Sequence, residues 1–216
     1  MYTRSPYLKV TGFRFSHSTS VATLFGIIFI IFISSYAFAG PPTQFLQTKI
    51  TAIRALIAKP TPNTKVKAQI DQELLSVIKP LMNFPKMSAK TLGKRWPTFN
   101  ADQQKRFINL FQDLVFYSYM KRIRSANEDY KLIYEDEEAQ PKGALVSAVA
   151  ETKKGSFELG FSLEELPTKN SFEVTDVIID EVSLVENYNE QFIKIIKKSG
   201  FDALLKKMND QLQKVK

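Results

Sequence analysis

The chain has 216 residues and a formal net charge of +8, and hydrophobic residues, including 17 phenylalanines, make up 44% of it. That apolar content is sufficient for one folded domain. The chain contains no cysteine, which excludes disulfides, thiolate metal sites and cysteine nucleophiles. Its only histidine, His17, lies close to the start, so the rest of the chain lacks the commonest general base near neutral pH.

Residues 1–39 have the pattern of a secretory signal peptide. Basic residues and no acidic ones precede an apolar run over residues 21–33, and Ala37 and Ala39 supply the small side chains of a cleavage site. We predict export, cleavage after Ala39 and a folded domain over residues 40–216. The apolar stretch, extended to Ala39, approaches the length of a membrane span, so an uncleaved anchor is the alternative.

The chain that follows is predicted to be helical. Apolar side chains recur every three or four residues over 45–57, and Pro60 ends that helix. Residues 66–78 repeat the pattern with a strict four-residue step, so one face of a second helix packs on a core. Pro80 and Pro85 predict a short break after it.

A longer helix is predicted to begin at Asn100 and to end near residue 126. Asn100 is a suitable N-cap, and Gln103 stands three residues later, where the partner in a capping box belongs. The basic cluster at residues 121–124 is favourable beside the negative end of the helix dipole. Contact with a lipid phosphate or a membrane surface is the alternative, and export argues against nucleic acid as a partner.

The next part of the chain changes to a period of two, which is typical of strands. Turn sequences at 153–155 and 167–170 separate the alternating segments. The acidic run at residues 135–138 is predicted to be a solvated loop. We predict four strands, at about 130–135, 143–152, 157–164 and 172–179.

The end of the chain returns to helical periodicity. Apolar residues over 184–195 predict a helix, Gly200 stands where a C′ glycine ends it, and a last helix follows over 204–215. Helices, then a run of strands, then helices indicate a single α+β domain.

Catalytic patterns in the sequence are weak. Ser-x-x-Lys spacing occurs at 76–79 and 118–121, but the companion motifs of penicillin-interacting enzymes are absent. Asp176, Asp180 and Glu181 lie close together, and a strand-end turn explains them more simply than a carboxylate site. We therefore expect no catalytic residue, no metal and no cofactor, with an enzyme acting through Asp176 or Asp180 as one alternative.

Aromatic and aliphatic stripes remain the strongest signal. One stripe follows the helix from Phe107 and another follows the strand from Phe157 to Leu163. Such stripes usually form a filled core, but two apolar faces that do not fully meet would leave a dry cleft. Sequence periodicity does not distinguish a filled core from a cleft.

Two segments resemble the MlaC family of periplasmic phospholipid-binding proteins, also called the toluene-tolerance auxiliary family. The first segment, residues 83–119, carries Asn83-Phe84, Leu92-Gly93, Trp96, the helix start at Asn100, Phe107, Phe111 and Tyr119. The second, residues 174–192, carries Val174-Thr-Asp176-Val177, Ser183-Leu184-Val185, Asn187-Tyr188 and Gln191-Phe192. Departures from the family pattern are Phe172 for tryptophan, Glu181 for glycine, Asn189 for arginine, and the helix-interrupting Pro85.

The resemblance implies an NTF-like fold, in which a curved antiparallel sheet packs against N-terminal and C-terminal helices around an apolar pocket. It implies a periplasmic shuttle without catalysis, which maintains outer-membrane lipid asymmetry. Its partners would be a diacyl phospholipid, an inner-membrane MCE-domain ABC transporter complex and an outer-membrane lipoprotein complex. The expected acyl-chain contacts are Phe107, Phe111, Leu114, Tyr119, Val149, Phe157, Leu159, Phe161, Val174 and Tyr188. A hopanoid-associated carrier of the same family and a periplasmic chaperone or adaptor without lipid are the alternatives.

Overall fold

Helices surround a meandering sheet in the part of the chain that the structure describes. The computed structural model describes residues 39–125, 130–153, 155–168 and 170–216, with the backbone alone for residues 121–125. The predicted α+β class is confirmed. In chain order the elements are α1 (Pro41–Ile57), α2 (Thr64–Leu81), α3 (Phe84–Leu92), the 3-10 helix η1 (Gly93–Thr98), α4 (Ala101–Ser125), β1 (Lys131–Gln140), β2 (Gly143–Thr152), β3 (Gly155–Glu165), β4 (Phe172–Ile179), β5 (Val182–Ser183) and α5 (Leu184–Val215).

Helix α4 begins with the predicted capping box. The Gln103 amide N–H donates to Asn100 Oδ1 at 2.9 Å, and the Asn100 amide N–H donates to Gln103 Oε1 at 3.0 Å. This reciprocal pair satisfies two backbone donors that an α-helix start would otherwise leave unpaired. The predicted helix end near residue 126 lies next to the last helical residue, Ser125.

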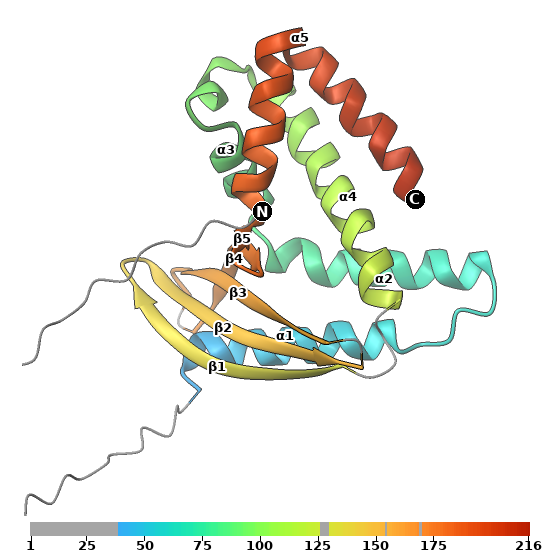
Figure 1. Cartoon of the computed structure of the whole chain (residues 1–216), viewed down its shortest axis with the longest axis vertical. Helices are drawn as coiled ribbons and strands as arrows, with labels where there is room; N and C mark the ends of the chain where they lie inside the picture. Colours follow the sequence, from blue (N-terminus) through green and yellow to red (C-terminus); the bar gives the residue numbers. More distant parts are fainter. Residues whose placement is uncertain (1–38, 126–129, 154, 169) are drawn as a thin grey trace, which may run out of the picture. The chain divides into compact units, whose positions relative to one another are not determined.

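Gly200 divides α5 into two segments, as its place in the sequence predicted. It has φ 82° and ψ 175°, which is not helical. A positive φ is readily adopted by glycine and is strained for other residues, so the chain can change direction there. Figure 1 shows the bend between the two segments of α5.

The junction between α2 and α3 is attached to the sheet. The predicted break between Pro80 and Pro85 is confirmed. It is short, because α2 continues past Pro80 to Leu81 and α3 begins at Phe84. Met82 forms a parallel bridge with Val174 of β4, and the Asn83 amide N–H donates to the Val174 carbonyl at 2.9 Å. Asn83 Oδ1 also caps α3 by accepting from the Lys86 amide at 2.8 Å.

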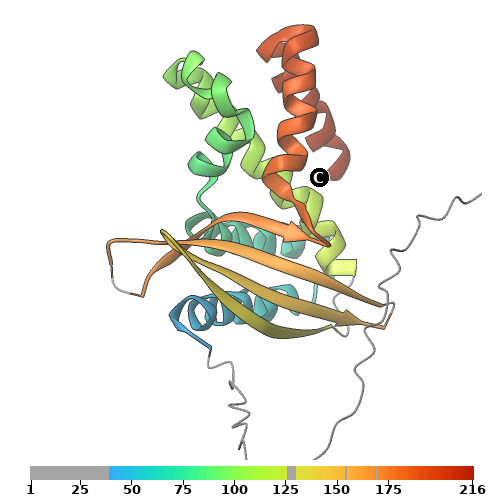
Figure 2. The same cartoon turned by 60° about the vertical axis from the view of Figure 1, so that its left-hand side comes forward.

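The five strands form one antiparallel sheet in the order β1-β2-β3-β4-β5. The four predicted strands are confirmed, and β5 adds two residues that pair with the end of β4. Register places Ala150 between Leu132 and Phe157, and Val146 beside Phe161, so these side chains share one face. Figures 1 and 2 show α1 running along this sheet, with α3, α4 and α5 gathered as a helical group.

The prediction of a loop at residues 135–138 is wrong, because these residues continue β1. Glu137 pairs with Val146 and Glu138 with Leu145, after a register irregularity between Tyr134 and Asp136. Backbone pairing with β2 therefore overrides the low strand preference of acidic residues. Since β1 is an edge strand, exposed carboxylates there also discourage pairing with another chain.

One carboxylate of the acidic run holds the start of α1. Helix α1 begins with two prolines, which have no amide N–H, so Thr43 carries the first free donor. Glu137 Oε2 accepts from the Thr43 amide at 2.9 Å and from Thr43 Oγ1 at 2.5 Å. The N-cap residue Gly40 makes no side-chain cap, and a Cβ there would collide with the Glu137 carboxylate. Glu137 thus replaces the missing cap and fixes α1 to β1.

The buried apolar residues fall into three clusters. The helical core joins α3, α4 and α5 and includes Met87, Phe107, Phe111, Phe192 and Leu204. The sheet core consists of Leu46, Leu81, Val146, Leu163, Phe172 and Val174. The α1–α2–α4 core consists of Ile57, Ile70, Leu74, Leu75, Phe116 and Met120.

Replacing Glu137 by alanine tests the cap on α1. We expect Glu137→Ala to lower the free energy of unfolding by about 1–2 kcal/mol, because a buried helix start loses its acceptor. Chemical denaturation measures the change. The exposed neighbour Glu138 supplies the control, and Glu138→Ala should stay within about 0.5 kcal/mol of the original protein. Equal losses in both variants would contradict the assignment.

Candidate functional site: an apolar cavity

A cavity of about 470 Å³ lies between the sheet and the helices. This volume is within the range of roughly 300–1,000 Å³ that is usual for small-molecule sites. The lining consists of Leu46, Ile50, Ile53, Ile57, Ile78, Leu81, Met82, Phe84, Val115, Phe116, Tyr119, Met120, Tyr130, Leu132, Ala150, Phe157, Leu159, Phe161, Val174, Val177, Ile179 and Leu184.

The cavity lies where the three clusters meet. Leu46 and Val174 belong to the sheet core, Ile57 to the α1–α2–α4 core, and Phe84 and Val115 to the helical core. The buried residues within each cluster pack against one another, and some members of each cluster also line the cavity. The cavity is therefore bounded by rigid packed groups on several sides.

Strand β2 contributes one small side chain, Ala150, to the lining. The inward face of β2 carries Ala144, Val146, Ala148 and Ala150, all at most 2% exposed. On the neighbouring strand the larger Phe157, paired with Ala150, also lines the cavity. Because alanine extends only one carbon from the sheet, Ala150 occupies little of the space in front of it.

The lining side chains differ in their exposure to solvent. Leu46 and Val174 are each 1% exposed. Tyr130, Phe157 and Ile179, near the turn between β2 and β3, are half-buried, and we call the part of the lining formed by these three residues the open end.

Among the described residues that line the cavity, none has a charged side chain, and the hydroxyls of Tyr119 and Tyr130 are their polar groups. Such a surface can bind hydrocarbon through burial of apolar area. Among the described residues, no group of three or more His, Cys, Asp or Glu is arranged to hold a metal ion. Within the same residues, no helix combines the length and apolar character needed to span a membrane.

The carboxylates of Asp176 and Asp180, near the end of β4, accept hydrogen bonds from backbone amides. Asp176 accepts from Ser183 Oγ at 2.5 Å, from the Val177 amide at 2.8 Å and from the Val185 amide at 3.1 Å, which fixes the start of α5. Asp180 Oδ1 accepts from the Glu158 amide at 3.0 Å. These contacts match the structural interpretation made from the sequence.

The turn between β4 and β5 explains one departure from the MlaC pattern. Asp180 and Glu181 have φ values of 47° and 66°, in the left-handed region. Glycine adopts this region without strain, so Glu181 keeps a glycine-type turn at some conformational cost. Among the other departures, Phe172 is 5% exposed and packs edge-on against Phe45, and Asn189 Nδ2 donates to the Thr91 carbonyl at 2.8 Å.

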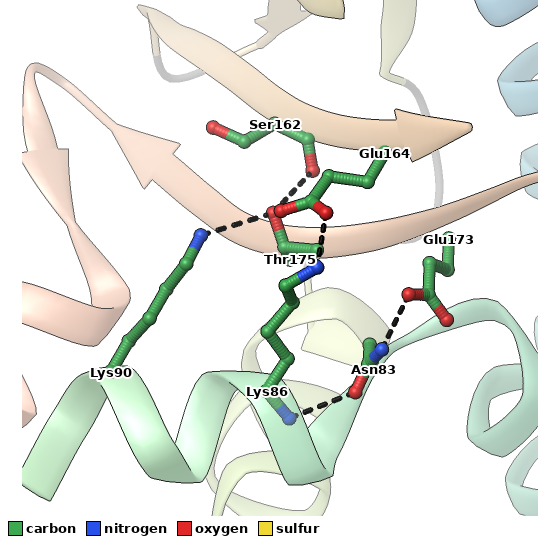
Figure 3. A network of polar contacts seen from close by, with 7 residues as sticks. All are labelled: Asn83, Lys86, Lys90, Ser162, Glu164, Glu173 and Thr175. Carbon is green, nitrogen blue, oxygen red and sulfur yellow. Dashed lines mark hydrogen bonds and ion pairs between the residues drawn. The ribbon is translucent and has the colours of Figure 1, made fainter. Parts of the chain in front are cut away.

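A polar network connects α3 to β3 and β4 (Figure 3). Lys86 pairs with Glu164, and Lys90 Nζ donates to Thr175 Oγ1 at 3.3 Å. Thr175 Oγ1 donates in turn to the Ser162 carbonyl at 3.4 Å, beside a register irregularity between β3 and β4. None of these residues is among the described lining of the cavity, so the network anchors α3 without adding polar groups there.

Five of the ten predicted contact residues line the cavity, namely Tyr119, Phe157, Leu159, Phe161 and Val174. Four others, Phe107, Phe111, Leu114 and Tyr188, pack in or against the helical core instead. The rings of Phe107 and Phe111 stack at 5.6 Å, and Tyr188 meets Phe111 edge-on at 5.2 Å. Phe107, Phe111 and Leu114 are placed differently because α4 contributes to two clusters, its N-terminal half to the helical core and its C-terminal half to the cavity lining. Tyr188 lies on α5, which packs against the helical core.

Val149 lies on the opposite face of the sheet from the cavity. Side chains alternate along a strand, and its neighbour Ala150 lines the cavity. Val149 is therefore not among the residues that line this cavity. The α1 lining, Ile50, Ile53 and Ile57, was missed as well, because its helical stripe gave no sign of which cluster it would face.

Arginine and tyrosine side chains meet at the open end. The Arg54 guanidinium lies over the Tyr130 ring at 4.5 Å from its centroid, and Arg54 Nη2 donates to the Tyr130 carbonyl at 3.0 Å. Burial raises the pKa of Tyr130, while Arg54 acts in the opposite direction. Burial also raises the pKa of Tyr134 to about 12, with a smaller contribution from Tyr130 and an opposing one from Arg54.

Comparisons with known proteins agree with this fold. The family model described as MlaC protein matches residues 47–210. A crystal structure of a phospholipid-binding protein from Ralstonia solanacearum, in complex with a phospholipid, superimposes with a TM-score of 0.69 at 19% identity. The match covers 81% of this chain and 98% of that one, and at this identity it shows a shared fold. A search of the curated proteins finds no match.

Filling the space beside β2 tests the cavity. We expect Ala150→Leu to weaken binding of an apolar fluorescent probe about tenfold, because the added methyl groups occupy the ligand's volume. Val149→Leu is the matched control, since it enlarges the adjacent residue on the other face and should leave probe binding unchanged. Titration of both variants measures the difference, and equal affinities would count against the cavity as the binding site.

The Tyr134 hydroxyl predicts a loss of stability in alkali. An unfolded tyrosine loses its proton near pH 10 and folded Tyr134 near pH 12, so folding loses stability as the pH rises between these values. Allowing for partial exposure, the loss is about 1 kcal/mol. Denaturation at pH 9 and pH 12 should show a smaller decline for Tyr134→Phe than for the original protein. Identical declines would mean that Tyr134 does not ionise differently on folding.

Proposed function

Because the chain belongs to the MlaC family, we propose that it is a phospholipid carrier that holds acyl chains in the apolar cavity and leaves the headgroup near solvent. The observation that carries the proposal is a cavity between sheet and helices whose described lining residues include no charged side chain. The phospholipid-bound protein of the same fold supports a phospholipid, rather than another apolar molecule, as the ligand.

The energetics suit a carrier without a motor. Two ordinary acyl chains, on the order of 30 methylenes at about 0.8 kcal/mol each, gain roughly 24 kcal/mol when they leave water. A bilayer supplies a similar gain, so transfer between membrane and cavity is close to balance. The cavity removes the barrier of crossing water, and any net direction must be driven by a partner.

The wider role follows from family membership. We assign residues 1–39 to a cleaved signal peptide, residues 40–216 to the lipid-binding domain and the working compartment to the periplasm. Residues 1–38 lie outside those that the structure describes. The carrier would exchange lipid between an outer-membrane lipoprotein complex and an MCE-domain ABC transporter complex, in the manner of an Mla pathway. We also propose that the carrier itself catalyses no reaction.

The lipid content of the purified protein tests this proposal. We expect solvent extraction and mass spectrometry to find about one diacyl phospholipid per chain. Leu159→Asp should reduce that occupancy at least tenfold, because an unpaired carboxylate in an apolar cavity costs several kcal/mol. Ser156→Asp is the control on the same strand, where the side chain is exposed, and it should keep the lipid.

Other outcomes would point elsewhere. A hopanoid in place of the phospholipid would identify a different cargo for the same cavity. Protein partners recovered with no lipid in the cavity would favour a chaperone or adaptor and would contradict the proposal.

A further inference from the structure

A cationic side chain stands at the open end of the cavity. Arg54 lies in the last turn of α1, between the lining residues Ile53 and Ile57. Its guanidinium lies against the ring of Tyr130, which also lines the cavity. The Arg54 side chain is otherwise exposed, so its charge meets solvent where the apolar lining ends.

Arg54 is held in position before any ligand arrives. Stacking on Tyr130 and the 3.0 Å hydrogen bond to the Tyr130 carbonyl restrict a side chain that would otherwise sample many rotamers. Arginine has five N–H donors, and the hydrogen bond to the Tyr130 carbonyl uses one of them. The others can form the paired hydrogen bonds by which a guanidinium binds phosphate oxygens.

From this arrangement we infer that Arg54 binds the phosphate of the ligand's headgroup. The inference rests on the proposed function, since it requires acyl chains inside the cavity. A lipid that enters with its chains toward Leu46 leaves its phosphate at the open end, beside Arg54. The lining then supplies affinity and the guanidinium selects lipids that carry phosphate.

Other cations on the same elements are placed differently. Lys131 follows Tyr130 but, by strand alternation, points to the opposite face, across from Glu151. Lys49 lies on α1 over the Phe45 ring at 5.4 Å, and Phe45 does not line the cavity. Lys49 therefore offers the same type of cation–aromatic contact on the same helix without access to the open end.

The test compares two lipids with identical acyl chains, dipalmitoyl phosphatidylglycerol and dipalmitoylglycerol, which lacks the phosphate. Each displaces an apolar fluorescent probe from lipid-stripped protein. We expect the original protein to prefer the phosphate-bearing lipid roughly tenfold, as for a charge-assisted hydrogen bond. Arg54→Gln should lose this preference and bind dipalmitoylglycerol as before, Arg54→Lys should keep part of it, and Lys49→Gln should keep all of it.

Each remaining outcome overturns the inference. An unchanged preference in Arg54→Gln would show that the guanidinium does not meet the phosphate. If Arg54→Gln lowered the affinity for both lipids equally, Arg54 would serve only to pack against Tyr130. In that case Tyr130→Leu, which keeps an apolar lining, would also lower the affinity for both lipids equally. Binding of inorganic phosphate alone, with loss in Arg54→Gln, would identify a free-phosphate site. Failure of both lipids to bind the original protein would instead contradict the proposed function.

Discussion

The structure depends on keeping an apolar space from being filled by the protein's own side chains. Large-to-small substitutions in protein cores cost about 24 cal/mol per Å³ of unfilled volume. On that scale a sealed and dry space of 470 Å³ would cost on the order of 11 kcal/mol, which is comparable to the whole stability of a domain. An open space costs less, but the surrounding elements must still resist collapse, so their anchors matter more than any single contact in the lining.

Those anchors lie outside the space that they preserve. Glu137 fixes the start of α1 to β1, and Asn83 fixes the α2–α3 junction to β4 through the Val174 carbonyl. Lys86 pairs with Glu164 and holds α3 against the sheet. Each contact is polar and lies away from the lining. Polar groups can therefore determine where the walls stand without adding hydrogen-bonding groups that a hydrocarbon could not satisfy.

Local signals predicted the elements well, and the site only in part. The capping box at Asn100, the break of α5 at Gly200 and the four main strands follow from rules that act within a few residues. The strand conformation of the acidic residues 135–138 does not follow from such local rules, because it results from pairing with β2, which is a separate segment of the chain. The site needed more than periodicity, since a stripe such as that of α4 identifies a buried face but not the cluster that buries it. Val149 and the lining residue Ala150 are neighbours on β2, and the alternation of side chains along the strand, which depends on register, determines which of them faces the cavity.

An apolar lining also limits what the cavity can recognise. Neighbouring acyl chains differ by single methylenes, each worth about 0.8 kcal/mol, so discrimination between chain lengths is weak. Headgroups differ in charge and hydrogen bonding, but the described lining residues include no charged group with which to distinguish them. Under the proposed function, selectivity for one class of lipid would depend on polar side chains beside the lining, such as those where the end of α1 meets the start of β1. A few polar side chains there can determine specificity, while the large apolar surface supplies most of the affinity and little of the specificity.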